Sequence, residues 1–280
     1  MKMRLSISLP SVLLVLTFLS LLKSPENSKL WTEIQPGLCL GIFQAPVKAE
    51  HGDSKIRIIK INPDSFDIDL YCSSEYDNKP RTLRQWAEEF GLIAAINAGM
   101  FATDLSTSIG FLKSHTHVNN PKINSSYKTI LACQPLEKNI VPVQIIDLTC
   151  SSFSEWENKY DSFLQSIRMI SCRQNNVWSQ QENEWSISAV AIDRKGYMLL
   201  IHSQSPYSVH DFNNMLLELP LNLYNAMYLE GGPQAGLYFS AGGLSGDYNG
   251  NSFVNLFLTG SGSNGWTVPN IIGIRKKVGD

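Results

Sequence analysis

The sequence predicts an α+β protein: a single domain of mixed, mainly antiparallel sheets with a few packed helices. Its 280 residues are 43% hydrophobic and 17% charged, which is enough apolar material for a substantial buried core. Short apolar runs separated by turn-forming clusters dominate the chain, and three segments carry helix-start signals. No long linker divides the sequence, so we expect one domain.

The first residues have the order of an export signal. Lys2 and Arg4 precede an apolar stretch over residues 9–22. The stretch is short for a membrane span, but a clean small-x-small cleavage site is missing. We therefore expect residues 1–28 to be a signal peptide or an uncleaved N-terminal anchor, and residues 29–280 to form the folded domain of a periplasmic or secreted protein.

Turn-forming clusters predict two hairpins. The Asn-Pro-Asp-Ser cluster at 62–65 separates two apolar runs, and Asp-Arg-Lys-Gly at 193–196 separates two more. These flanking runs cover residues 56–61, 66–71, 187–192 and 197–202. Other expected strands cover 38–43, 93–97, 109–113, 129–133, 143–147, 166–170, 226–230, 236–239, 253–258 and 270–274.

Capping boxes predict three helices. The first is capped by Thr82 and closed by Gly91, the second begins at Ser154, and the third begins at Ser208 and ends at Pro220. The first and third carry apolar residues on one face. The polar segments 115–126, 241–252 and 259–265 predict loops.

Export would place the five cysteines in an oxidising compartment. Cys150 and Cys172 flank the second helical segment and could pair, although the sequence does not decide the connectivity. Cys39, Cys72 and Cys133 lie in strand-like runs, where a buried free thiol is expected. No pair of cysteines has the spacing of metal ligands, so we expect neither a metal nor a cofactor.

Two apolar runs stop abruptly at a polar residue followed by glycine. The first ends at Asn97 and the second at Glu230, and each follows a predicted helix. Because a polar residue at a strand end leaves the sheet where glycine permits close backbone approach, the two ends predict one cleft built from distant parts of the chain.

Both strand ends carry a family resemblance. They read Asn97-Ala98-Gly99-Met100-Phe101 and Glu230-Gly231-Gly232-Pro233-Gln234. They resemble the Asn-Gly-Gly-Phe-Phe and Asp-Gly-Gly-Gly-Ser motifs of the phosphodiester glycosidase family, and residues 34–274 resemble its bacterial branch. The resemblance implies a secreted hydrolase that cleaves the glycosidic bond of a sugar-1-phosphodiester.

The motifs also depart from the family pattern. Ala98 stands in place of Gly, Met100 in place of Phe, and Glu230 in place of Asp. The family often has an Arg-Thr pair before the strand at 189–192, where this chain has Ile187-Ser188. These replacements keep a second reading open, a non-catalytic glycan-binding module on the same fold, and a weaker third, a phosphatase-like hydrolase of another type.

Three residues are candidates for catalysis. Glu230 at the edge of an apolar strand is expected to have a raised pKa suited to acid–base work, unless it only accepts hydrogen bonds from its own glycine turn. Asn97 can donate to a phosphate or a sugar hydroxyl, or can simply stabilise a turn. His210, in the first turn of the third helix, could relay a proton, and His202 is the weaker candidate.

Arg168 lies within an apolar run and could bind a phosphate, or could face solvent from an edge strand. The remaining candidate substrate-binding residues are Gly99, Met100, Phe101, Gly231, Gly232 and Gln234. Bound sugar could stack on Phe101 and on Tyr228 or Tyr238.

Other ligand classes are disfavoured. The net charge of −2 argues against nucleic acid. The sequence contains no Gly-x-Ser-x-Gly and no phosphate-binding Gly-x-x-x-x-Gly-Lys motif. Segment 246–251 carries oxygen ligands but lacks a complete calcium loop. The expected partner is a small-molecule or glycan phosphodiester, with membrane contact only through an uncleaved anchor.

Overall fold

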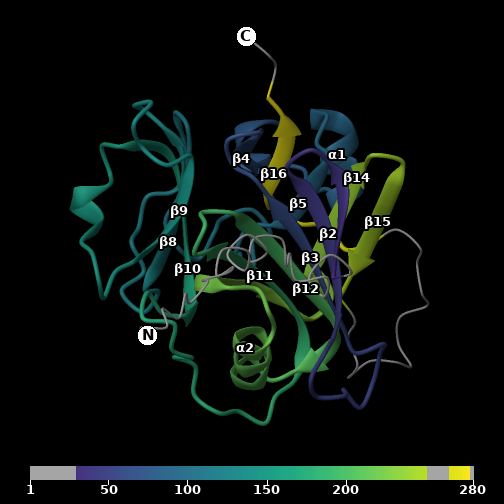
Figure 1. Cartoon of the computed structure of the whole chain (residues 1–280). Coiled ribbons are helices and arrows are strands. Elements are labelled where there is room, and N and C mark those ends of the chain that lie inside the picture. The colour runs from purple at the N-terminus through teal and green to yellow at the C-terminus, as the bar shows by residue number, and fades with distance from the viewer. Residues whose placement is uncertain (1–29, 251–264, 278–280) are drawn as a thin grey trace, which may run out of the picture.

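Two antiparallel β-sheets pack face to face in the computed structural model, which describes residues 30–250 and 265–277 (Figure 1). The expected signal segment 1–28 and the expected strand 253–258 lie outside the described residues. No helix in the described part of the chain is long and apolar enough to cross a membrane.

The larger sheet has eleven strands in the order β1-β2-β3-β12-β11-β13-β10-β6-β7, and β8 and β9 continue it from β10. Its strands are β1 (Trp31–Gln35), β2 (Leu38–Gln44), β3 (Lys55–Ile61), β6 (Leu112–Ser114), β7 (His117–Asn120), β8 (Thr129–Pro135), β9 (Val143–Asp147), β10 (Tyr160–Ile170), β11 (Trp185–Asp193), β12 (Met198–Tyr207) and β13 (Leu223–Gly231).

The smaller sheet has five strands in the order β15-β14-β5-β16-β4. They are β4 (Phe66–Cys72), β5 (Ala94–Asn97), β14 (Gly236–Ala241), β15 (Leu244–Asn249) and β16 (Asn270–Lys276). The predicted hairpin around 193–196 is confirmed as β11–β12. The one predicted around 62–65 is wrong: the chain turns there, but β3 and β4 do not pair and belong to different sheets, so the chain crosses between the sheets at that turn.

One helix covers the outer face of each sheet (Figure 1). Helix α1 (Leu83–Phe90) buries Trp86 and Leu83 against the smaller sheet, and α2 (Val209–Glu218) buries Phe212 and Leu216 against the larger one. The caps predicted at Thr82, Gly91 and Ser208 are confirmed. A third apolar cluster fills the space between the sheets.

The expected α+β class with mixed sheets is wrong, because the described chain is mostly β. It holds two α-helices beside sixteen strands, and every pairing between those strands is antiparallel. The helix expected from Ser154 is a single 3-10 turn, Phe153–Glu155, whose capping box begins at Ser152. A capping box satisfies the first amides of a helix but does not supply the apolar face that a longer helix needs.

Two segments expected as loops contain strands. Residues 117–120 form β7 and 244–249 form β15, both at sheet edges. Edge strands have one unpaired side and carry polar residues, so their sequences resemble loops. Cys150 and Cys172 are bonded to each other, and Cys72 and Cys133 are buried thiols.

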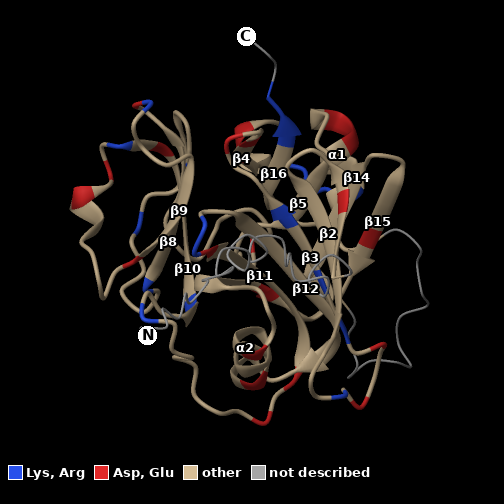
Figure 2. Cartoon of the chain, viewed as in Figure 1, with Lys and Arg blue, Asp and Glu red and all other residues tan. Residues whose placement is uncertain are grey.

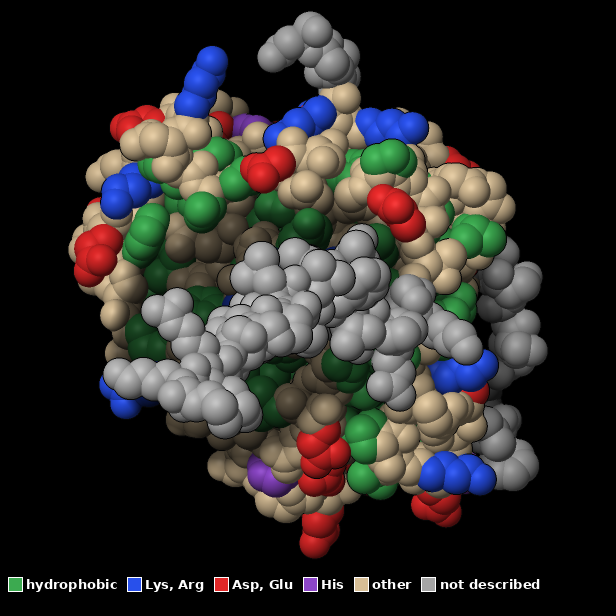
Figure 3. Space-filling view, in the orientation of Figure 1, with side chains coloured by type: hydrophobic (Ala, Val, Ile, Leu, Met, Phe, Trp, Pro, Cys, Tyr) green, Lys and Arg blue, Asp and Glu red, His purple; other side chains and the backbone are tan. Residues whose placement is uncertain are grey.

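Charges of both signs are interspersed on the molecule and form no single-sign block on the face in view (Figures 2 and 3).

An ionic contact joins the two sheets. His115 follows β6, and its Nδ1 lies 2.9 Å from Asp161 on β10, while Nε2 lies 3.0 Å from Asp69 on β4. Burial lowers the pKa of His115, but the two carboxylates outweigh this effect and leave the pKa raised.

This contact predicts a pH-dependent contribution to stability. A histidine whose pKa is raised in the folded state stabilises fully below its unfolded pKa of about 6.5 and loses that contribution as pH rises through the folded pKa. His115→Gln should therefore lower the free energy of unfolding at pH 5.5 by on the order of 0.5–1 kcal/mol, because partial exposure screens the pair. The difference should shrink by pH 8.5 in urea titrations.

His117→Gln is the matched control, since His117 Nε2 bonds the neutral Ser74 hydroxyl at 2.9 Å. An equal pH-dependent loss in both variants would refute the role assigned to His115.

Candidate functional site

The two motif strands end beside one another, although they belong to different sheets. Ser188 of β11 lies opposite Glu230 of β13 in register. Its Oγ donates to Asn97 Oδ1 at 2.8 Å and lies 3.3 Å from the backbone oxygen of Glu230. One hydroxyl thus connects β5 of the smaller sheet to β13 of the larger sheet at the edge of the inter-sheet layer.

Asn97 has one free donor at this junction. Its side chain is 1% exposed, and Oδ1 accepts hydrogen bonds from Ser188 and from the Gly236 amide at 3.2 Å. These two donors fix the orientation of the amide. Nδ2 is buried and has no partner among the described residues. Because an unsatisfied buried donor costs free energy, Nδ2 is suited to receive an oxygen of a ligand.

Glu230 both holds the glycine turn and has a raised pKa, the two alternatives that the sequence left open. Its Oε1 accepts a hydrogen bond from the Gly231 amide at 2.9 Å, as a turn-holding carboxylate would. Burial nevertheless raises the pKa of Glu230 to about 7, and the Gly231 hydrogen bond offsets this only in part. Both protonation states are therefore populated near neutral pH, as acid–base chemistry requires.

Aromatic side chains surround the end of β13. Trp178 packs on Tyr228 with ring centroids 5.4 Å apart. A β-carbon on Gly231 would lie 2.6 Å from Trp185 Cδ1 and would also clash with the Tyr228 hydroxyl. Burial raises the pKa of Tyr127, and the charge of Glu230 raises it further. Glycine at 231 is thus needed for close packing.

A polar row extends from Ser188 across the larger sheet. His202 on β12 lies opposite Ser188, and Arg57 on β3 lies opposite His202. Burial, with a further contribution from the charge of Arg57, lowers the pKa of His202 to about 3, so this ring is neutral. Arg57 is 8% exposed, pairs with Asp53 and lies over the Tyr248 ring at 4.4 Å.

Sequence reasoning missed Arg57 and Ser188. Two nitrogens of Arg57, Nε and Nη1, are buried and have no partner among the described residues. The available signal was a cation in the middle of an apolar run, Lys55–Ile61, the same signal that pointed to Arg168. The signal for Ser188 was its place in Ile187-Ser188, where the family often has an Arg-Thr pair, although that comparison assigned the serine no role.

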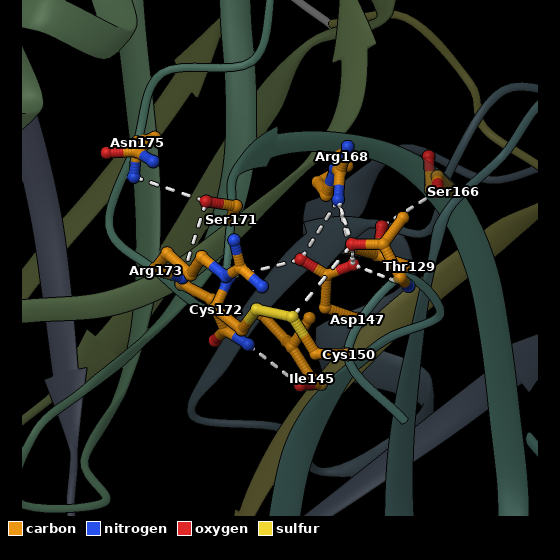
Figure 4. Close-up of polar contacts among 12 residues, drawn as sticks. Thr129, Ile145, Asp147, Cys150, Ser166, Arg168, Ser171, Cys172, Arg173 and Asn175 are labelled. Atoms are coloured by element: carbon orange, nitrogen blue, oxygen red, sulfur yellow. Dashed lines mark hydrogen bonds and ion pairs between the residues drawn. A yellow bond between two sulfur atoms is a disulfide. The ribbon is translucent and has the colours of Figure 1, made fainter. Parts of the chain in front are cut away.

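Arg168 lies apart from the row. Its Nη1 bonds Asp147 Oδ1 at 3.0 Å and also contacts Thr149, beside the Cys150–Cys172 disulfide (Figure 4). Asp147, Cys150 and Cys172 form the one group of three potential metal ligands found in the described ranges, but the two sulfurs are bonded to each other.

His210 also lies away from Ser188. It lies in the first turn of α2, on the outer face of the larger sheet, and its Nδ1 lies 3.2 Å from Asp211 Oδ1. No contact between described residues joins it to Asn97, Ser188 or Glu230.

The candidate residues of the two glycine motifs pack in different places. Gly99 and Gly232 adopt positive φ angles of 73° and 68°, which favour glycine. Phe101 packs against the cluster that holds the buried side chains of α1, whereas Met100 packs against the cluster between α2 and the larger sheet. Gln234 ends a partly exposed 3-10 turn, Gly232–Gln234.

Solved structures share this fold. The catalytic domain of zebrafish N-acetylglucosamine-1-phosphodiester alpha-N-acetylglucosaminidase, auto-inhibited by its pro-peptide, has a TM-score of 0.61 at 14% identity, covering 88% of this chain and 86% of that one. A hypothetical protein from Synechocystis has a TM-score of 0.58 at 15% identity, covering 87% of this chain and 63% of that one. At such identities the likeness establishes the fold alone.

A comparison with curated proteins finds no match. The family model for phosphodiester glycosidases, in contrast, matches residues 90–275. This span is more than half of the 280 residues and contains both Asn97 and Glu230. The chain belongs to the phosphodiester glycosidase family.

Proposed function

We propose that the protein hydrolyses the bond between the anomeric carbon of a sugar and a phosphodiester oxygen. The observation that carries this proposal is the junction at Ser188. There the buried Nδ2 of Asn97, which has no partner among the described residues, lies beside the strand end that carries a carboxylate with a pKa of about 7. A donor for oxygen and a titrating carboxylate are the two groups that such a reaction uses.

In this proposal Glu230 acts in its ionised form. A water oxygen attacks the anomeric carbon, a water proton passes to the carboxylate, and the carbon–oxygen bond breaks with its electron pair leaving on the phosphate. The products are the free sugar and a phosphate monoester. Because the phosphate oxygen leaves readily, strong acid assistance is not required, and the carboxylate also stabilises positive charge on the sugar ring.

The phosphate would be held by donors along the polar row. Asn97 Nδ2 supplies one hydrogen bond, and Arg57 supplies the cation on the same face of the larger sheet. Neutral His202 separates Arg57 from Ser188 without adding charge. We assign no part in the reaction to His210, because its contacts lie at the start of α2.

A glycan-binding module is the second candidate. The hydrogen bond from the Gly231 amide to Glu230 favours it, since this bond would hold the turn in a protein without activity. Such a module would bind a sugar-1-phosphodiester and release no product.

Glu230→Gln separates these functions. The amide keeps an oxygen for the Gly231 hydrogen bond but cannot ionise. If Glu230 takes the water proton, turnover of a sugar-1-phosphodiester should fall by about two to four orders of magnitude while the fold stays intact. Glu218→Gln, an identical change at an exposed end of α2, is the control and should keep full activity. Full activity of Glu230→Gln would remove this residue from the mechanism.

The pH dependence gives a second test. Because the ionised carboxylate is the reactive form, kcat/KM of the wild type should rise with pH and level off above about 7. A rate that instead falls above pH 7 would contradict the role as a base and indicate a general acid.

We further propose that the protein works in the periplasm or outside the cell. The charged start, the apolar stretch 9–22 and the Cys150–Cys172 disulfide support this location. Fractionation of the source cell should recover the protein outside the cytoplasm. A cytoplasmic pool with an intact N-terminus would contradict the proposal.

A further inference from the structure

A groove beside β10, the strand that pairs with β13, has basic side chains in its lining. Its volume is about 380 Å³, and Lys128, Arg168 and Trp178 are among its lining side chains, with two glutamines and two serines. The lining holds two cations and no carboxylate. Elsewhere in the chain, basic and acidic residues are interspersed in the view of Figure 2.

The groove lies along β10, whose Ile167 and Arg168 pair with Tyr228 and Met227 of β13. Ser126 and Lys128 line it, and burial and the charge of Glu230 raise the pKa of Tyr127 between them. Arg168 lies opposite Met227, three residues before Glu230. At the rise of a β-strand, three residues correspond to about 10 Å.

The groove offers different contacts along its length. The Trp178 ring packs on Tyr228, and its Nε1 donates to Gln181 Oε1 at 2.8 Å, so the ring is held in place. A held aromatic face suits the apolar face of a sugar ring. Lys128 is exposed, and Arg168 keeps Nη1 on Asp147. Asp147 thus already neutralises Arg168, and exposed Lys128 is the cation that can meet an anion bound beside the ring.

We propose that this groove binds the leaving group of the substrate and selects one that carries a second phosphate. The substrate class is then a repeating sugar phosphate, in which one phosphodiester is cleaved near Glu230 and the next lies between Lys128 and Arg168. The sugar between the two phosphates stacks on Trp178. This inference rests on the proposed function for the identity of the cleaved bond, but the groove itself can be tested without catalysis.

The test is calorimetric binding of two leaving groups to the full chain: a sugar with one phosphate, and the same sugar with two. The second phosphate should tighten binding by about tenfold, because a hydrogen bond to a charged group contributes about 1.5 kcal/mol. Lys128→Gln should remove most of this preference, and raised salt should weaken it in the wild type. Lys122→Gln removes the same charge from an exposed position outside the groove lining and should keep the preference.

Equal affinity of the wild type for both ligands would overturn the proposal, as would an equal loss in Lys122→Gln and Lys128→Gln. Trp178→Ala should weaken the binding of both ligands. Wild-type affinity in this variant would show that neither sugar stacks on Trp178. Cleavage is scored separately on a phosphodiester whose leaving group has no second phosphate. If this phosphodiester is not cleaved, the proposed function is refuted. If the second phosphate does not tighten binding, the role proposed for the groove is refuted.

Discussion

The hydrogen bond from Ser188 to Asn97 is the contact on which the candidate site depends. It joins β11 of the larger sheet to β5 of the smaller sheet at the point where β5 and β13 end. The apolar layer between the sheets fixes their separation but not the alignment of individual strand ends, because hydrophobic contact is non-directional. A buried hydroxyl with a single good acceptor is directional, so it sets which residues of β5 and β13 meet.

That alignment explains the chemistry of the neighbouring groups. Asn97 must present Oδ1 to Ser188 and Gly236, which leaves Nδ2 as the free donor. Glu230 lies where protein surrounds most of its carboxylate, so its charged form is disfavoured and its pKa rises. The missing side chain at Gly231 lets Tyr228 and Trp185 close over the same strand end. The same contacts therefore form both the candidate site and the tight turn at Gly231.

The sequence predicted features with a local cause. The caps at Thr82 and Ser208 and the hairpin turn after β11 depend on a few adjacent residues, and Asn97 and Glu230 were found because each ends an apolar run. It failed where the cause is distant. The edge strand β15 resembled a loop, and Arg57 and Arg168 gave the same signal although only Arg57 shares a row with Ser188. The 3-10 turn at Phe153–Glu155 was mispredicted for a local reason, because its capping box lacks the apolar face that a longer helix needs.

Hydrolysis in oxygen-18 water tests the central claim most directly, because it reports which bond of a sugar-1-phosphodiester breaks. If water attacks the anomeric carbon, mass spectrometry should find the label in the released sugar and none in the phosphate monoester. Label in the phosphate would show attack at phosphorus and contradict a glycosidase mechanism. Binding of the substrate with no released sugar would contradict catalysis altogether and leave the glycan-binding function.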